Sequence, residues 1–151
     1  MLIRAATRSD IGFLVASNQA MARETEDKHL DAETLQAGIG AVFDAPQRGF
    51  YWIAERDGAA VGCLLITYEW SDWRNGDWWW IQSVYVTPEA RRHGVFRALY
   101  EQIERDARAA PGVIGLRLYV EHENERAQRT YQALGMHAEH YHMYAKGFVI
   151  L

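Results

Sequence analysis

The segment from Val84 to Tyr100 constrains this chain most, because an apolar strand pattern runs through an arginine-rich turn directly into an amphipathic helix pattern. The first N–H groups of a helix have no partner within the helix, and the helix dipole adds roughly half a positive charge at that end. The same turn carries four basic side chains: Arg91, Arg92, His93 and Arg97. The segment therefore predicts a binding site for an anion, such as a phosphate, at the start of the helix.

The overall charge indicates that this basic turn is a local feature. The chain has 151 residues, enough for one domain around one core, and its net charge is −4 at pH 7. A protein that binds polyanions in general carries an excess of positive charge. We therefore expect no nucleic-acid partner.

The cysteine content and the lengths of the apolar runs indicate the cellular compartment in which the protein is expected. Cys63 lies in an apolar run and has no second cysteine with which to form a disulfide. It is expected to be a core residue, and a single cysteine suits a reducing compartment. No stretch has the length and apolar character of a signal-peptide core or a membrane span. We expect a cytoplasmic protein with no membrane partner.

Hydrophobic periodicity and turn signals predict the order of the elements. Strands are expected at residues 2–5, 50–55, 60–69, 78–86 and 114–120, and a strand pair in the tail, 136–151. One helix is expected to start at the capping-box-like pair Thr7 and Asp10 and to fray by residues 24–27, and others are expected at 32–43, 94–109 and 124–134. Hairpin turns are expected at Asp57-Gly58 and Asn75-Gly76, and a helix C-cap at Gly135.

This order, β-α-α-β-β-β-α-β-α-β with one more strand if the tail forms a pair, predicts a mixed α/β fold. A mostly antiparallel central sheet is expected, flanked by helices on both faces.

A second motif stands about 30 residues after the basic turn. Residues 124–136 read NERAQRTYQALGM, which is similar to the pattern Asn-x-x-Ala-x-x-x-Tyr-x-x-x-Gly-Phe, and Arg91-x-x-Gly94-x-Phe96 is similar to Arg/Gln-x-x-Gly-x-Gly/Ala. In this order, the two resemble the signatures of the GNAT N-acetyltransferase family. The order of elements also resembles that family's fold along the whole chain. The resemblance predicts a single N-acetyltransferase domain over residues 1–151.

The resemblance implies acetyl-CoA as the co-substrate and no metal. In the family, the pantetheine arm of the coenzyme pairs with the strand before the loop, here through the backbone of Val84, Tyr85 and Val86. The pyrophosphate meets the loop and the start of the helix: Arg91, Arg92, His93, Gly94, Val95, Phe96 and Arg97. Glycine at position 94 has no Cβ where the phosphate must approach closely.

Phe96 departs from the small residue of the family pattern. Its spacing to Leu99 and Tyr100 places the ring on the buried stripe of the helix, which would leave the backbone N–H toward the phosphate. The alternative is a positive φ at residue 96, which a phenylalanine would resist.

The second motif carries the catalytic expectation. Asn124 and Tyr131 are seven residues apart, nearly two helical turns, so both project from one face with the small Ala127 between them. The resemblance implies that Asn124 hydrogen-bonds the coenzyme and that Tyr131 protonates the departing thiolate, although a structural tyrosine is the alternative. The amine would attack the thioester directly, with the oxyanion held by a strand N–H such as that of Tyr85.

The identity of the base is open. Many family members have a glutamate where this chain has Gln82, and a glutamine cannot accept the amine's proton. The role would fall to Glu69, Asp72 or a water relay. Gln82 also sustains an alternative function, a non-catalytic module that binds coenzyme A or senses a ligand with the same cleft.

Residues 68–80 concentrate tryptophans around one predicted turn: Trp70, Trp73, Trp78, Trp79 and Trp80. Aromatic rings with carboxylates can hold a cation, which makes Glu69, Trp70, Asp72 and Gln82 candidates for binding a small-molecule, polyamine-like or protein amine acceptor. The acidic residues 24–27 could face the same cleft or simply be solvated. Alternatively, the hairpin has a structural role and packs on a helix or on a homodimer partner. A third hypothesis is that the hairpin stacks on sugar or on single-stranded nucleic acid. The negative net charge argues against binding to nucleic acid.

Three tail histidines, His137, His140 and His142, raise the question of a metal. His140 and His142 would share a strand face, but no cysteine or aspartate completes a ligand set. We expect no metal site.

Overall fold

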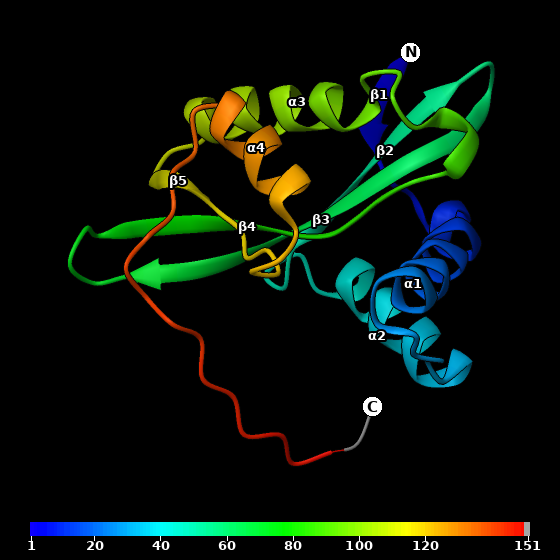
Figure 1. Ribbon diagram of the computed structural model, residues 1–151, viewed down its shortest axis with the longest axis horizontal. Helices are drawn as coiled ribbons and strands as arrows, with labels where there is room; N and C mark the ends of the chain where they lie inside the picture. Colours follow the sequence, from blue (N-terminus) through cyan, green and yellow to red (C-terminus); the bar gives the residue numbers. More distant parts are fainter. Residues whose placement is uncertain (150–151) are drawn as a thin grey trace. The chain divides into compact units, whose positions relative to one another are not determined.

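The structure, a computed structural model, describes residues 1–149 (Figure 1). Its strands are β1 (Leu2–Ala5), β2 (Phe50–Arg56), β3 (Ala59–Ser71), β4 (Gly76–Val86) and β5 (Val113–Arg117). Its α-helices are α1 (Ile11–Glu26), α2 (Ala32–Asp44), α3 (Val95–Ala109) and α4 (Glu125–Ala133). The chain divides into two compact units: a first unit, residues 1–117, holds the whole sheet, and a second unit from residue 118 onward holds α4. Within the described range, no helix is both long enough and apolar enough to cross a membrane.

The strands of the first unit form one sheet in the order β1-β2-β3-β4-β5, antiparallel throughout except for the parallel pair β4 and β5. The Asp57-Gly58 turn is confirmed, and the second turn lies slightly earlier than predicted, at residues 72–75, because Gly76 already pairs with Ser71 as the first residue of β4. Asp57 and Gly58 have φ angles of 54° and 78°, as a two-residue type I′ turn requires, and Asn75 has a φ of 51°. The predicted mixed α/β fold with a mostly antiparallel sheet is therefore confirmed.

Two neighbouring residues of β3 show how the helices cover the sheet. A Cβ added to Gly62 would lie only 2.8 Å from Cγ1 of Val95, the first residue of α3. Cys63, the next residue, is fully buried in a cluster that contains Leu14 of α1 and Ile39 of α2. Because successive strand residues point to opposite faces, α3 covers one face and α1 with α2 covers the other (Figure 1).

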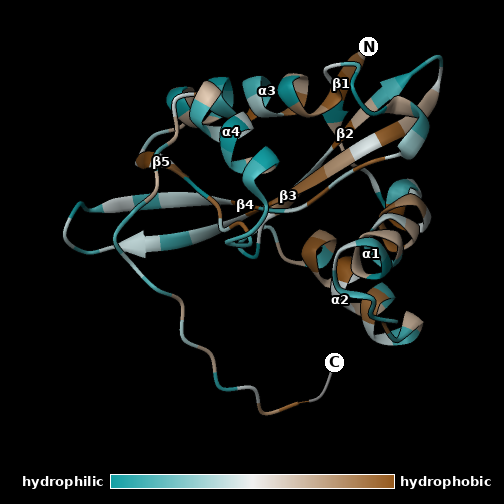
Figure 2. Ribbon diagram, viewed as in Figure 1, coloured by the Kyte–Doolittle hydropathy of each residue, from teal (hydrophilic) through white to brown (hydrophobic). Residues whose placement is uncertain are grey.

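Hydrophobicity changes along β3 (Figure 2). The first part of the strand is hydrophobic, and its end at the turn into β4 is pale to hydrophilic. The burial pattern agrees, since residues 61–64 are buried and residues 68–70 are exposed. The core therefore lies under the first part of β3, and the far end of the β3–β4 hairpin projects beyond it.

In the second unit, α4 ends as predicted and the tail does not. The C-cap is a Schellman motif in which Gly135 has a φ of 92° and the N–H of Met136 donates to the carbonyl oxygen of Tyr131 at 3.0 Å. The predicted strand pair is absent from residues 136–149, and residues 150–151 lie outside the described range. The expected strand 114–120 also ends earlier, at Arg117. A strand forms only by pairing with another segment, and β5 is the edge of the sheet in the described chain, with no tail residue paired to it.

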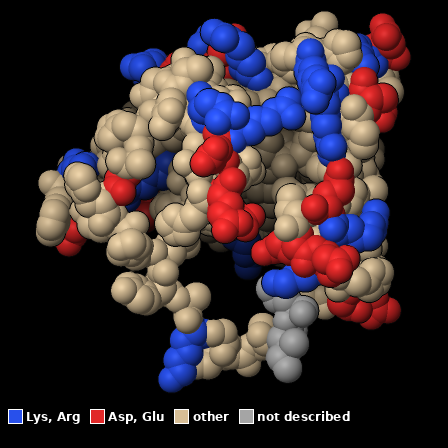
Figure 3. Space-filling view, viewed as in Figure 1, with Lys and Arg blue, Asp and Glu red and all other residues tan. Residues whose placement is uncertain are grey.

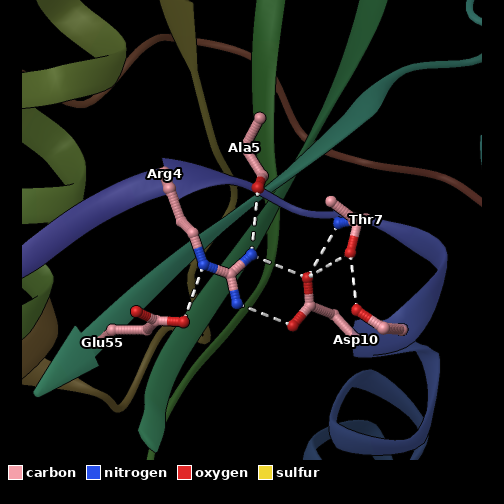
Figure 4. Close-up of polar contacts among 6 residues, drawn as sticks. Arg4, Ala5, Thr7, Asp10 and Glu55 are labelled. Carbon is pink, nitrogen blue, oxygen red and sulfur yellow. Dashed lines mark hydrogen bonds and ion pairs between the residues drawn. The ribbon is translucent and has the colours of Figure 1, made fainter. Parts of the chain in front are cut away.

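A partly buried ion network joins the start of α1 to the first strands (Figure 4). The guanidinium of Arg4 donates to both carboxylate oxygens of Asp10, at 2.8 and 2.9 Å, and to Glu55 at 2.8 Å. Asp10 also accepts from the backbone N–H of Thr7 at 2.7 Å, which completes the predicted capping box. These hydrogen bonds, chiefly that from Arg4, lower the pKa of Asp10, which is 7% exposed.

We expect Asp10→Asn to destabilise the fold by about 2–3 kcal/mol, because it leaves the half-buried Arg4 without its main partner. The matched control is Asp44→Asn, which removes the exposed ion pair with Arg8 and should cost under about 1 kcal/mol. Since the pKa of Asp10 is lowered in the folded state, its contribution is complete above the unfolded value of 3.8 and is lost as the pH falls through the folded value. Urea unfolding at pH 7 and near pH 3 checks this. A difference between wild type and Asp10→Asn that persisted unchanged at low pH would contradict the assignment.

Candidate active site

The loop between β4 and α3 is the segment in which the anion site is predicted. After a short 3-10 turn (Pro88–Ala90), Arg92 has a φ of 67° and Gly94 has a φ of 76°. Gly94 is the N-cap of α3, and no side chain caps the first N–H groups of this 15-residue helix. These N–H groups and the helix dipole therefore remain available to an anionic ligand.

The first residues of α3 dock on the sheet. Val95 is 2% exposed, and Gly62 of β3 leaves the space that its side chain occupies. The helix then buries the stripe that spacing predicted, at Leu99, Tyr100, Ile103 and Ala107. Phe96 is half-buried beside Tyr100, with ring centroids 6.2 Å apart, and its φ is not positive. Phenylalanine at this position is thus compatible with a regular helix start.

The basic residues of the loop have different surroundings. Arg91 forms an ion pair with Glu24 of α1, whereas Arg97 pairs within α3 with Glu101 at 2.8 Å. Arg92 and His93 are exposed. In the region of α1 and α2, acidic side chains lie directly beside basic ones (Figure 3). Of the two arginines that form these ion pairs, Arg91 is therefore the one paired with another element of the first unit.

Strand β4 contains a bulge just before the loop. Cys63 faces Tyr85 and Leu65 faces Gln82, so Ser83 and Val84 together oppose one residue of β3. Ser83 has a φ of 50°. Apart from aspartates and an asparagine, the non-glycine residues of the described chain with positive φ are Ser83 and Arg92. Such unfavourable backbone conformations gather at functional sites, and here both flank the predicted coenzyme strand.

The backbone N–H of Tyr85, two residues after Ser83 in this bulge, influences the pKa of Cys63. Burial raises the pKa of the Cys63 thiol to about 11, and hydrogen bonds from Ser17 and from the Tyr85 backbone N–H counter part of this rise. The predicted core position of Cys63 is confirmed. The oxyanion role of the Tyr85 N–H stays a prediction, and it would require this N–H to be shared with the thiol.

The β3–β4 hairpin brings Glu69 together with two partners. One oxygen of Glu69 accepts from the indole N–H of Trp80 at 2.8 Å, and the other accepts from Arg117 of β5 at 3.0 Å. The guanidinium of Arg117 stacks on Trp78 at 4.0 Å, and that of Arg74 lies 5.4 Å from the same ring. The hairpin thus carries a cluster of aromatic and charged groups, whose carboxylate is already paired with an arginine.

The other predicted acceptor residues lie along the same hairpin. The side-chain amide of Gln82 donates to the hydroxyl of Thr67 across the two strands. Trp70 is 61% exposed, and Asp72 is exposed in the turn that joins the strands. Trp73, in the same turn, is 86% exposed. The hairpin therefore offers an accessible aromatic surface with both signs of charge.

Asn124 and Tyr131 belong to the second unit. The side-chain oxygen of Asn124 caps α4 by accepting from the N–H of Ala127 at 3.1 Å. Tyr131 is half-buried in the last turn of this helix, and burial raises its pKa above 10.0. A phenol with a raised pKa stays protonated at neutral pH, as an acid catalyst must.

The tail histidines gather no further ligands. Among residues 1–149, no three His, Cys, Asp or Glu side chains are grouped closely enough to hold a metal ion. His137, His140 and His142 are exposed.

Several residues of this region had weaker signals in the sequence. Gly62 interrupts an apolar strand, which is a sign that another backbone or helix approaches closely. Arg117 and Ser83 gave no signal, because cross-strand contacts and bulges depend on the register of the sheet. Glu24 stood out only as part of an acidic run.

The mixed sheet and its helices define an acetyltransferase fold, because solved acetyltransferases share it. The chain belongs to the acetyltransferase (GNAT) family, whose model matches residues 14–136. Membership implies acetyl transfer that depends on an acyl-CoA. No curated protein matches the chain significantly.

Solved structures extend the likeness over the whole chain. A possible acetyltransferase from Clostridium difficile 630 is 39% identical, with a TM-score of 0.91 over 99% of this chain and 98% of that one. A Trypanosoma brucei acetyltransferase is 20% identical, with a TM-score of 0.72 over 96% of this chain and 98% of its own. AAC(6')-Iy, in complex with a CoA-S-monomethyl-acetylneamine bisubstrate analog, is 21% identical, with a TM-score of 0.75 over 97% of both chains. The last two show the fold alone.

Proposed function

We propose that this protein is an acetyl-CoA-dependent N-acetyltransferase that transfers the acetyl group directly to a primary amine of a small molecule or a protein. The observation that carries the proposal is the uncapped start of α3 behind Arg91 and Gly94. An uncapped helix N-terminus with a nearby guanidinium suits the pyrophosphate of the coenzyme. The family model runs across both units, which supports one N-acetyltransferase domain over the chain.

The coenzyme would extend from this loop along β4. Backbone groups of Val84, Tyr85 and Val86 would pair with the amides of the pantetheine arm, because a strand can accept an added extended segment. Strand β5 pairs with β4 only as far as Trp80, so the part of β4 from the bulge onward has an edge that β5 does not cover. For Asn124 and Tyr131, the proposed roles remain those that the resemblance implies: a hydrogen bond to the coenzyme and protonation of the thiolate.

The aromatic hairpin would form the acceptor side. The AAC(6')-Iy complex holds an aminoglycoside-derived group linked to coenzyme A, which supports an amine acceptor in this fold. Here, the exposed Trp70 and the carboxylates of Glu69 and Asp72 supply rings and negative charge for an ammonium group. Arg117 offsets the charge of Glu69, so an acceptor of low net positive charge fits this surface better than a strongly cationic one.

An acceptor screen tests the proposal. The purified chain is incubated with acetyl-CoA and single amines (a polyamine, aminoglycosides and a lysine-containing peptide), and free coenzyme A is measured with a thiol reagent. The buried thiol of Cys63 should contribute little background. Release that depends on an amine, with acetylated product confirmed by mass spectrometry, is expected. Tight binding of coenzyme A without release for any amine would favour a non-catalytic coenzyme-binding or ligand-sensing module.

With an acceptor in hand, Glu69→Gln and Asp72→Asn should each raise the KM for the amine about 3- to 30-fold, because each removes a carboxylate from the acceptor surface. The dissociation constant for acetyl-CoA should not change. Asp57→Asn, in the β2–β3 turn, is the matched control for loss of an exposed carboxylate. If all three variants have wild-type kinetic constants, the hairpin has a structural or oligomer-contact role instead.

A further inference from the structure

The side chain of Arg91 is held on three sides within the first unit. Its Nε donates to the carbonyl oxygen of Val86, the last residue of β4, at 3.0 Å. Its Nη2 lies 2.9 and 3.2 Å from the two carboxylate oxygens of Glu24. Its guanidinium carbon is 5.4 Å from the ring centroid of Tyr85. The Tyr85 side chain is a further hydrogen-bond partner of this guanidinium and of Glu24. The contacts to Val86 and Glu24 use Nε and Nη2, and Nη1 carries two more N–H groups, each able to donate to a phosphate oxygen.

The position of Glu24 is not explained by the stability of its own helix. It lies in the last turn of α1, where the helix dipole disfavours a negative charge. The ion pair is also open to water, with side-chain exposures of 43% for Arg91 and 40% for Glu24, and exposed pairs add little to folding stability. The contact with Glu24 instead restricts the long side chain of Arg91 at the first position of the coenzyme loop.

We propose that Glu24 is a positioning residue for coenzyme binding, because it fixes the Arg91 guanidinium so that its Nη1 groups face the pyrophosphate. The inference rests on the proposed function and adds a residue 67 positions away in the sequence from the loop that it serves. A flexible arginine loses rotamer freedom when it binds a phosphate, and a side chain that is already restricted loses less. The benefit must exceed the repulsion between the carboxylate and the anionic coenzyme.

Because of that repulsion, the two possible roles of Glu24 predict opposite changes in the affinity for coenzyme A. If Glu24 acted only as a nearby negative charge, its removal would tighten the binding of an anion. If it positions Arg91, its removal weakens binding. The matched control is Glu26→Ala, which removes an equal charge from the same helix end, where Glu26 contacts Lys28 at 4.0 Å and not Arg91.

Titration calorimetry with coenzyme A, which binds without turnover, measures the effect in wild type, Glu24→Ala, Glu26→Ala, Arg91→Ala and the double variant Glu24→Ala/Arg91→Ala. We expect Glu24→Ala to raise the Kd about 2- to 10-fold and Glu26→Ala to leave it equal or slightly lower. In the Arg91→Ala background, Glu24→Ala should have no further weakening effect, because it acts through Arg91. Dephospho-coenzyme A, which lacks the 3′-phosphate, should give the same ratios if the pyrophosphate is the group that Arg91 meets.

The variants distinguish a failure of the proposed coenzyme site from a failure of the proposed role of Glu24. Wild type that fails to bind coenzyme A would refute the coenzyme site itself. Arg91→Ala that binds as wild type does would refute the contact of Arg91 with the coenzyme and, with it, the role of Glu24. Tight wild-type binding that Arg91→Ala weakens, with Glu24→Ala binding as well as wild type or better, would overturn only the role of Glu24. An equal loss from Glu24→Ala with and without Arg91 would also overturn it. Once an acceptor is known, a positioning role predicts a higher KM for acetyl-CoA with unchanged kcat.

Discussion

Gly94→Glu should weaken the binding of coenzyme A by about 10- to 100-fold, the value of one or two charge-assisted hydrogen bonds at the start of α3. The substitution places a carboxylate at the N-cap, where the pyrophosphate is expected to lie. A Cβ at this position meets no atom within 4 Å, so the added side chain enters open space and does not clash with the protein. Calorimetry with coenzyme A measures the change.

A matched control removes the effect of backbone strain. Gly58→Glu adds the same side chain at a glycine whose φ is 78°, compared with 76° at Gly94, and it too has no atom within 4 Å of the new Cβ. Both variants should lose similar stability, on the order of 1 kcal/mol, because glutamate resists a positive φ. Only Gly94→Glu should lose coenzyme affinity. Equal affinities in the two variants would move the pyrophosphate away from this helix start.

The parts of this structure that the sequence predicted are those that depend on near neighbours. The Asp57-Gly58 turn needs only two residues that accept positive φ. The buried stripe of α3 follows from spacing along one helix, and the cap at Gly135 follows from a local motif. The uncapped start of α3 after Gly94 is of the same kind, because the glycine and the helix start are adjacent in the chain, and its role as an anion site stays a prediction.

The features that were missed depend on residues far apart in the sequence. Glu69 meets Arg117 across 48 positions, and nothing in the sequence indicated that the carboxylate proposed to face an amine would be paired with an arginine. The bulge at Ser83 is a register shift between two strands, which no local pattern fixes. The tail failed for a related reason. A strand there would require pairing with a distant segment such as the edge strand β5, and no pattern within the tail fixes such a pairing.

Tyr131→Phe should slow acyl transfer by roughly 10²- to 10⁴-fold if Tyr131 protonates the departing thiolate. Phenylalanine keeps the packing of the half-buried ring and removes only the hydroxyl, so fold and coenzyme affinity should hardly change. The raised pKa of Tyr131 also has a consequence for pH dependence. Because burial keeps the phenol protonated above its usual value of 10.0, the transfer rate should show no loss from this group up to about pH 10.

The rate constant to compare is that of the acyl-transfer step itself. If product release limits the wild type, steady-state kcat would hide part of the loss, so single-turnover measurements with a cognate amine are the fair comparison. Tyr51→Phe is the matched control, since Tyr51 is a buried tyrosine of β2 whose pKa burial raises to about 12. It should transfer at the wild-type rate. A Tyr131→Phe enzyme that matched Tyr51→Phe would remove the acid role and leave Tyr131 as a wall of the thioester pocket, with protonation of the thiolate falling to water.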